Sequence, residues 1–304
     1  MRHKFSVAPM MEWTDRHCRM LHRLLTRETL LYTEMVTADA VIHGDRARLI
    51  GFDPREHPVA LQLGGSDPAR LTEAAKIGAE FGYDEINLNV GCPSDRVQNG
   101  MIGACLMKQP LLLADCISAM QDADDIPVSL KCRVGVDDMD SDDALEDFVA
   151  TLAQTGLRTF IIHARIAILQ GLSPRENREI PPLNYARVFG IKRSFPDLEI
   201  VINGGIRSLD QAEELLTGVD GVMVGREAYQ NPYLLSEVDR RFFGSNDVPP
   251  SRQDIIRDLL PYVEREISRG VALKHITRHV LGLFQGLPGA RKWRRCLCRR
   301  WWRR

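Results

Sequence analysis

Eight short runs of apolar, largely β-branched residues recur along the chain, and segments with helical periodicity separate most of them. The runs are FSVAP, LLYTEM, VALQLGG, EINLNVG, VSLKCRV, TFIIHA, EIVINGG and GVMVGR. The intervening segments PARLTEAAKIGAEFG and SLDQAEELLTGV carry apolar residues at i, i+3 and i+4, and they end at or near glycine. In the second segment Gln211 follows Ser208 at the spacing of a capping box. Strand and helix repeated in this way predict an α/β fold, a (β/α)8 TIM barrel.

A doubly wound parallel sheet is the main alternative, because it also alternates strands with helices. That fold usually has a GxGxxG turn after its first strand. Here the segment after the first run, APMMEWTD, contains no glycine. The sequence therefore favours the barrel.

The composition changes near FFGSNDVPPSRQD, where glycine, serine, asparagine and two prolines indicate a linker. Beyond it, IIRDLLPYVEREISRG and LKHITRHVLGLFQGL have the periodicity of amphipathic helices. We expect a barrel domain over residues 1–243, followed by a small C-terminal helical domain with a basic tail over residues 244–304. A length of 304 residues and a hydrophobic content of 44% are sufficient for this arrangement.

The sequence predicts neither export nor membrane insertion. No apolar run approaches the length of a bilayer-spanning helix. The first residues, MRHKFSVAPM, lack the apolar core and cleavage site of a signal peptide. Seven scattered cysteines indicate reduced thiols in a cytoplasmic protein. Cys296 and Cys298 have no second Cys or His pair near them in sequence, so we expect no metal site.

The charges are unevenly distributed, although the formal net charge is only −1. From Arg291 onward, RKWRRCLCRRWWRR contains only basic residues, tryptophan, cysteine and leucine, whereas DDMDSDDALED in mid-chain is acidic. Such an asymmetry indicates a polyanionic partner.

Polar residues or glycines end nearly every predicted strand, and the strand ends of a barrel share one rim. Each has an ordinary structural explanation when taken singly. Gln62 suits a loop cap, Lys131 a solvated strand end, His163 a core histidine and Cys92 a small buried filler. Together they describe a site. The residues are Pro9, Met10, Glu34, Gln62, Asn89, Cys92, Lys131, His163, Asn203, Gly204, Gly205, Gly225 and Arg226.

Two glycine turns follow the last two predicted strands, where barrels bind phosphate through backbone N–H groups. Arg226 adds a charge that can bind phosphate in a bidentate manner. Lys131, His163 and Gln62 would surround a planar ring, and a cation near the N1 and C2 carbonyl of a flavin stabilises its reduced anion. A phosphate at one end and an electron-rich ring at the other indicate FMN as the cofactor.

Six segments together resemble the tRNA-dihydrouridine synthases, specifically the A subfamily, from about Val7 to Arg295. They are APMMEWTDRHCR, LQLGGSDP, NLNVGCPSDRVQNG, GLSPRENREIPPL, INGGI and GLFQGLPGARKWRR. The resemblance implies an FMN barrel, a C-terminal helical domain and NADPH-dependent reduction of tRNA uridines, at D-loop positions 20 and 20a. It implies no protein partner, and we expect a monomer.

The resemblance also implies roles for individual residues. The catalytic acid falls on Cys92. The tRNA contacts fall on Asn89, Arg175, Arg178, Arg291 and Arg294. The FMN contacts fall on Pro9, Met10, Met11, Gln62, Lys131, His163, Asn203, Gly204, Gly205, Gly225 and Arg226.

The chemistry explains why a cysteine stands between glycine and proline at a strand end. Reduction of the uracil C5=C6 bond needs a hydride at C6 and a proton at C5. A thiol with a pKa near ~8.5 is mostly protonated at neutral pH, yet it gives up its proton readily. Gly91 and Pro93 make a stiff turn that presents Cys92, and Asn89 suits a uracil carbonyl.

The target uridine must be turned out of folded RNA, which costs a few kcal/mol. Phosphate contacts from Arg175, Arg178 and the cluster at 291–295 can offset this cost. The alternative for these arginines is a solvated charged loop and a frayed basic tail.

The chain departs from the family at three places. Ile166 and Ile168 stand where a basic and an aromatic residue are usual, so one charge and one stacking surface are missing. Met101 and Ile102 replace a more polar or aromatic pair. The ending CLCRRWWRR does not resemble the helical tail of the family, and we assign it no catalytic role.

Two other functions fit parts of the sequence. An FMN barrel acting on a free pyrimidine or another small enone would not need an arginine-rich second domain. An RNA-binding barrel without a cofactor would not need Lys131, Gln62, Asn203 and the glycines.

Overall fold

The strands form a single sheet in which every pairing is parallel. The computed structural model describes residues 3–94 and 101–299. Within them the strand order is β1-β9-β8-β7-β6-β5-β4-β2, and β3 also pairs with β4. The strands are β1 (Phe5–Val7), β2 (Leu31–Tyr32), β3 (Val36–Thr37), β4 (Val59–Gly64), β5 (Glu85–Asn89), β6 (Val128–Arg133), β7 (Thr159–His163), β8 (Glu199–Asn203) and β9 (Gly221–Val224).

The two ends of this strand order, β1 and β2, meet and close the sheet. Ser6 and Leu30 form a parallel bridge, and Val7 N–H donates to the Leu30 carbonyl at 3.0 Å. The sheet is therefore a barrel, and the predicted fold class is confirmed. The second predicted strand, LLYTEM, differs in detail, because only Leu31–Tyr32 form β2 and a further short strand, β3, follows the run; both pair with β4.

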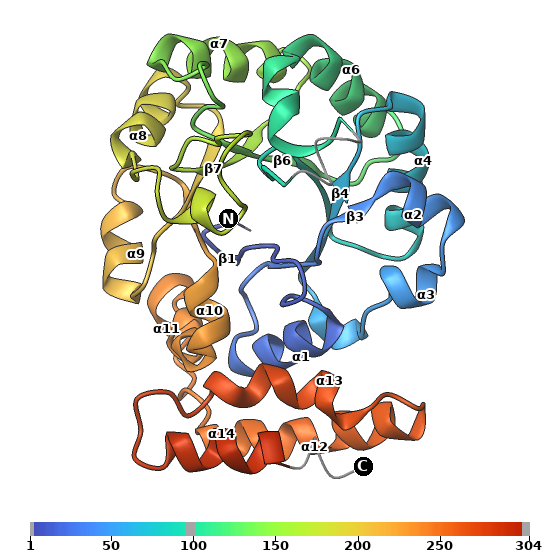
Figure 1. Ribbon diagram of the computed structural model, residues 1–304, viewed down its shortest axis with the longest axis vertical. Coiled ribbons are helices and arrows are strands. Elements are labelled where there is room, and N and C mark those ends of the chain that lie inside the picture. Colours follow the sequence, from blue (N-terminus) through green and yellow to red (C-terminus); the bar gives the residue numbers. More distant parts are fainter. Residues whose placement is uncertain (1–2, 95–100, 300–304) are drawn as a thin grey trace.

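Helices follow the strands and surround the barrel (Figure 1). Asp67 caps α4 ahead of Pro68, and Ser208 caps α9 by accepting from Gln211 N–H. The predicted capping box is half formed, because the Gln211 Oε1 accepts from Arg207 N–H at 2.9 Å. The helices are α1 (Arg16–Leu25), α2 (Ala38–His43), α3 (Arg46–Leu49), α4 (Pro68–Glu80), α6 (Pro110–Gln121), α7 (Asp142–Ala153), α8 (Tyr185–Ser194), α9 (Leu209–Leu215), α10 (Arg226–Gln230) and α11 (Val238–Phe243).

Closure of the sheet separates two apolar cores. One lies between the strands and the helices and contains residues such as Leu61 and Ile86. Alternate residues of a strand point to opposite faces, so the intervening positions fill the barrel interior. On β4, β5 and β6 the interior includes the buried polar residues Gln62, Asn87 and Ser129. The apolar part of the interior consists of Ala8, Leu30, Tyr32, Ala60, Ile161, Val201 and Met223.

The remaining helices pack on one side of the barrel, beside α1 (Figure 1). Gly244, with a left-handed φ of 72°, ends α11, and Asp15 at the start of α1 accepts from Arg278 at 2.5 Å and from His279 at 3.1 Å. The domain boundary at residue 244 stays a prediction. Nowhere in the described residues is a helix long and apolar enough to cross a membrane. These helices are α12 (Arg252–Ser268), α13 (Leu273–Thr277) and α14 (Ala290–Arg299).

Candidate active site

The register of the strands brings the predicted polar residues together at the carboxyl-terminal rim of the barrel. Asn89 lies beside Lys131, and His163 lies beside Asn203. Asn89 Nδ2 donates to Gln62 Oε1 at 2.9 Å, and Lys131 Nζ donates to Asn203 Oδ1 at 3.1 Å. Side chains from five neighbouring strands, β4 to β8, therefore form one contiguous polar surface.

Cys92 lies in the turn after β5, and hydrogen bonds hold this turn on both sides. The Asn89 Oδ1 accepts from the N–H groups of Gly91 and Cys92, each at 3.1 Å. The Cys92 carbonyl accepts from Ala104 N–H at 2.9 Å. Cys92 is half-buried, whereas Pro93 is buried. The turn therefore keeps the cysteine at the rim without enclosing it.

Two cations and a histidine stand at the ends of β6 and β7, next to this turn. Burial, reinforced by the charge of Arg133, lowers the pKa of Lys131 to about 8. Burial also lowers the pKa of Arg133 to about 10 and the pKa of His163 well below its ordinary value. The turn that carries Cys92 is tied to Arg133, whose Nε donates to the Gly91 carbonyl. At neutral pH the rim holds two positive charges and a neutral imidazole.

Arg133 was not among the predicted site residues, and it joins two parts of the site. Its side chain is 3% exposed. Nε donates to the Gly91 carbonyl at 2.9 Å, and Nη1 donates to the carbonyls of Ile166 and Asn177, both at 3.0 Å. It thereby links the turn after β5 to the loop after β7. The signal was present in the sequence, because Arg133 follows Lys131 by two residues and alternate strand residues share a face.

The two predicted glycine turns follow β8 and β9, which are adjacent strands. Gly204 and Gly205 have φ values of 119° and 69°. A Cβ on Gly204 would lie 2.7 Å from the His163 ring, so only glycine lets the backbone pass this close to the imidazole. Gly225 and Arg226 follow β9 at the same rim. The two glycine turns therefore lie on adjacent strand ends, and the phosphate site there stays a prediction.

Arg226 already has an anionic partner. Its Nη1 lies 2.9 Å from Glu179 Oε1, and its Nη2 donates to the Arg178 carbonyl at 3.4 Å. Glu179 also lies 3.9 Å from Arg175 Nε. The side chains of the Arg226–Glu179 pair are 37% and 46% exposed, so another anion can compete for the guanidinium.

One buried asparagine organises the loop after β7. Asn177 Oδ1 accepts from Ile168 N–H, and Asn177 Nδ2 donates to the Ile168 carbonyl, both at 2.8 Å. Arg175 and Arg178 are exposed on this loop. Ile166 and Ile168 contribute backbone groups to these contacts. The contacts at Ile166 and Ile168 use only backbone atoms and so do not depend on these two side chains.

The remaining predicted residues lie in two places. Pro9, Met10 and Met11 follow β1 at the rim, and Met11 is 58% exposed. Arg291 and Arg294 lie on α14, which packs against the turn at 278–282 and not against the strand ends. The structure thus brings the predicted FMN residues together and places these two arginines on a separate surface.

Two predicted features lie partly outside the described residues: residues 95–100 of the NLNVGCPSDRVQNG segment and residues 300–304 of the ending. In the described ranges, no group of three or more His, Cys, Asp or Glu residues is arranged to hold a metal ion.

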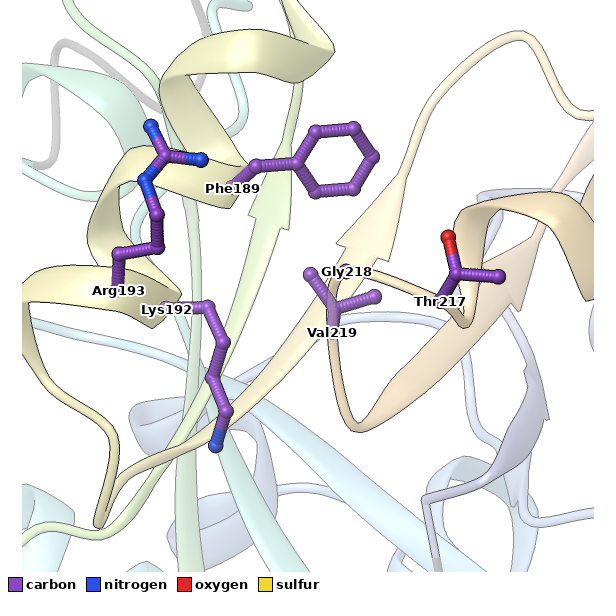
Figure 2. Close-up of a pocket in the computed structure, with 6 residues that line it drawn as sticks. All are labelled: Phe189, Lys192, Arg193, Thr217, Gly218 and Val219. Atoms are coloured by element: carbon purple, nitrogen blue, oxygen red, sulfur yellow. The ribbon is translucent and has the colours of Figure 1, made fainter.

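A hollow of about 500 Å³ lies outside the barrel, where α8 and α9 end and before β9 begins (Figure 2). Lys192 in its wall donates to the Pro196 and Leu198 carbonyls and lies 2.7 Å from Asp220, so its ammonium is fully engaged. The hollow is at the opposite end of the strands from Cys92. Its lining residues are Phe189, Lys192, Arg193, Thr217, Gly218 and Val219.

The residues of the rim fit FMN. The phosphate of FMN needs backbone N–H groups and cations, and its ring presents acceptor atoms that suit an ammonium group. Gly204 and Gly225 lie on adjacent strand ends beside Arg226. The Lys131 ammonium has three N–H groups and gives one of them to Asn203. The site therefore holds positive charge for the phosphate and a donor for the ring.

Comparisons with known proteins point in the same direction. A family model described as "Dihydrouridine synthase (Dus)" matches residues 6–300. The tRNA-dihydrouridine(20/20a) synthase of Escherichia coli (strain K12) is 61% identical over 295 residues, covering 97% of this chain and 85% of that protein. The protein of the same name from Vibrio cholerae is 59% identical over 293 residues, covering 96% and 89%.

Solved structures of low identity share the fold. The old yellow enzyme homologue from Zymomonas mobilis has a TM-score of 0.55 at 12% identity, covering 81% of this chain and 89% of that chain. The crystal structure of TcOYE with pHBA has a TM-score of 0.56 at 12% identity, covering 79% and 89%. At this identity the likeness concerns the fold alone.

Proposed function

The chain belongs to the dihydrouridine synthase family, A subfamily, and from this premise we propose that it reduces the C5=C6 bond of uridines in tRNA, using a flavin. The observation that carries the proposal is the position of Cys92 on one rim with Asn89, Lys131 and His163. The relatives named tRNA-dihydrouridine(20/20a) synthase favour uridines 20 and 20a as the targets.

FMN is the proposed cofactor, and NADPH is the proposed reductant. The backbone of Gly204, Gly205 and Gly225 would bind the phosphate together with Arg226. When bound, FMN supplies the hydride that C6 of the uracil receives. The residues proposed around its ring are Pro9, Met10, Met11, Gln62, Lys131, His163 and Asn203.

Cys92 is the proposed acid. A hydride at C6 leaves negative charge that is resolved by a proton at C5, and the Cys92 S–H bond supplies that proton. The resulting thiolate regains a proton from solvent, which the half-buried position of Cys92 allows. An amide N–H of Asn89 is the proposed donor to a uracil carbonyl, and the occupation of Asn89 Oδ1 by backbone N–H groups supports this assignment.

The tRNA backbone is the proposed partner of the exposed arginines. Arg175 and Arg178 lie beside the rim, and Arg291 and Arg294 lie on α14, so the RNA would span both surfaces. Contacts to phosphate weaken steeply with salt. The free-pyrimidine alternative predicts no salt dependence of this kind. A monomeric state, a cytoplasmic location and a preference for NADPH over NADH belong to the same proposal.

The test is the substitution Cys92→Ala in the FMN-loaded protein. We expect NADPH oxidation in the absence of RNA to continue, and dihydrouridine formation in unmodified tRNA to fall by at least about 10²-fold, the range for loss of a general acid. Mass mapping of the tRNA measures the product and its position. Undiminished product in Cys92→Ala would reject the role of Cys92. Reduction of free uridine as fast as tRNA would favour the small-enone alternative.

A further inference from the structure

A column of hydrogen-bonded side chains runs through the barrel from its floor to the Cys92 turn. Ser129 Oγ donates to Glu85 Oε1, and Asn87 Nδ2 donates to Ser129 Oγ at 2.7 Å. Gln62 Nε2 donates to Asn87 Oδ1 at 2.8 Å, and Asn89 Nδ2 donates to Gln62 Oε1 at 2.9 Å. Of these five residues, all but Asn89 are at most 1% exposed. The mechanism proposed above uses only the upper end of the column.

The contacts at the lower end of the column determine which groups in it donate hydrogen bonds and which accept them. Glu85 Oε2 lies 2.6 Å from His3 Nε2, and Tyr32 Oη donates to Glu85 Oε1 at 3.0 Å, so the carboxylate is surrounded by donors. Ser129 has a single hydroxyl hydrogen and gives it to Glu85. Ser129 must therefore accept from its other neighbour, which makes the nitrogen of Asn87 face it.

The contacts at the upper end independently require the same order of donors and acceptors. The backbone N–H groups of Gly91 and Cys92 can only donate, so the oxygen of Asn89 must face them. Its nitrogen then faces Gln62 and donates to the Gln62 oxygen. Both ends of the column agree, and each amide between them has one permitted orientation.

We propose that Glu85 and Ser129 are positioning residues for the reaction at Cys92. By accepting at the floor, Glu85 favours the same amide orientations that the N–H groups of the Cys92 turn require, and the two ends together hold Asn89 with its nitrogen, and not its oxygen, towards a substrate carbonyl. The same column holds the Asn89 oxygen against the N–H groups of the Cys92 turn. This inference rests on the proposed function for its role in catalysis, but not for its effect on the turn.

His3 helps to keep the Glu85 carboxylate, at the floor of the column, a hydrogen-bond acceptor. It bonds to Glu85 and, through Nδ1 at 2.8 Å, to Glu199, which also accepts from Thr159 at 2.9 Å. A Cβ on Gly221 would lie 2.1 Å from the His3 carbonyl, so this glycine gives His3 its room. The opposite half of the interior, lined by residues such as Val201, is apolar and contains no such chain in the described structure.

The test compares Ser129→Ala with Tyr32→Phe. Both variants remove one buried hydroxyl that donates to the same Glu85 oxygen. Only Ser129→Ala interrupts the column. We expect both to lower Tm, and only Ser129→Ala to slow single-turnover reduction of tRNA, by about tenfold at saturating RNA.

A second readout does not depend on the reaction. In cofactor-free protein, the alkylation rate of Cys92 by iodoacetamide, resolved by peptide mass spectrometry, should rise at least threefold in Ser129→Ala. In Tyr32→Phe the alkylation rate should stay within twofold of that of the protein without substitutions. Should Ser129→Ala not fold, the isosteric Glu85→Gln replaces it, because a carboxamide can donate to Ser129 and thereby removes the single direction of the column.

The outcomes separate the two proposals. Equal effects of Ser129→Ala and Tyr32→Phe on both readouts overturn the positioning role. A difference in alkylation together with no activity of the unmodified protein on tRNA leaves the column intact as an inference and refutes the proposed function.

Discussion

The two ends of the barrel stabilise buried positive charge with different partners. At the floor, His3 lies between Glu85 and Glu199, at 2.6 and 2.8 Å, and its charge is balanced by these carboxylates. At the mouth, Lys131 bonds to an amide oxygen and Arg133 to three backbone carbonyls. The mouth therefore holds cations that neutral dipoles solvate, and this arrangement suits a site that must receive an anion.

The pKa values express this difference. Burial alone would lower the pKa of His3, but hydrogen bonds and charge from Glu199 and Glu85 raise it to about 9. Burial lowers the pKa of Lys131 to about 8, and the nearby charge of Arg133 adds to the effect. At the floor, carboxylate partners raise the pKa of His3. At the mouth, no carboxylate of the described residues raises the pKa of Lys131, so burial lowers it. Protonated His3 at the floor therefore stabilises the folded protein. Charged Lys131 at the mouth destabilises it, but its charge remains available to a ligand.

The largest expected effect comes from removing the cation at the mouth. Lys131→Met should reduce dihydrouridine formation by about 10²- to 10³-fold, the range for loss of one preorganised group that stabilises charge. It should not lower Tm, because folding disfavours the charged form of Lys131. Product analysis and thermal unfolding of the same preparation measure the two quantities.

The matched control is Lys108→Met. Lys108 is half-exposed and pairs with Asp137 and Asp138 at 3.0 and 3.2 Å. Exposed pairs of this kind contribute at most about 1 kcal/mol, so activity should stay within about twofold. A Lys131→Met enzyme that is as active as the control, or that unfolds many degrees earlier, would remove the contrast between floor and mouth.

The floor should produce a smaller effect, on stability and on its pH dependence. The unfolded pKa of His3 is near 6.5 and its folded pKa is about 9, so folding favours the protonated form. Its contribution of about 3 kcal/mol is fully present below about pH 6.5 and is lost as the pH rises through 9. Urea unfolding at pH 6.5 and pH 9.5 should therefore show a decline that is much weaker in His3→Gln.

A surface pair of the same chemistry provides the control. His57 Nδ1 lies 2.7 Å from Asp84 Oδ2, but the His57 side chain is 41% exposed. His57→Gln should lower the free energy of unfolding by at most about 1 kcal/mol, since solvent screens exposed pairs. If His3→Gln and His57→Gln behave alike, burial is not what separates the floor from ordinary surface pairs.

Much of the mouth was predictable from sequence because strand ends in a barrel share one rim. Lys131, His163 and Asn203 each follow an apolar run, and the structure pairs His163 with Asn203 and lets Lys131 donate to Asn203. Glu85 and Asn87 were missed, although they alternate with buried apolar residues in EINLN. A polar residue at alternate positions normally indicates solvent, and only closure of the sheet turns that face into the interior.

The loop after β7 shows a different limit. Its sequence, with Arg175 and Arg178, suggested RNA contacts, and both arginines are exposed. The pairing of Arg226 with Glu179 was not foreseen, because it depends on how Asn177 folds the loop through non-local backbone contacts. The sequence shows which charged residues a loop contains, but it does not show which of them form ion pairs.

The smallest expected effect concerns this pair, and it tests whether the mouth is truly open to an anion. If the phosphate of FMN must displace the Glu179 carboxylate from Arg226, then Glu179→Gln should tighten FMN binding. The pair is largely exposed, so the gain is at most about 1 kcal/mol, or up to about fivefold in Kd by flavin fluorescence.

Glu176→Gln is the control, because Glu176 lies in the same loop, is exposed, and accepts from Ser173 N–H at 2.8 Å. It changes the charge of the loop equally without touching Arg226. Equal tightening by both variants would indicate a general field over the mouth, and no tightening by Glu179→Gln would place the phosphate away from Arg226. Selective tightening would mean that the mouth has one compensated cation, Arg226, whose carboxylate partner is exchanged for phosphate on binding. The difference between floor and mouth would then lie in whether the carboxylate partner can be replaced, since His3 and its carboxylates are buried and the Arg226–Glu179 pair is not.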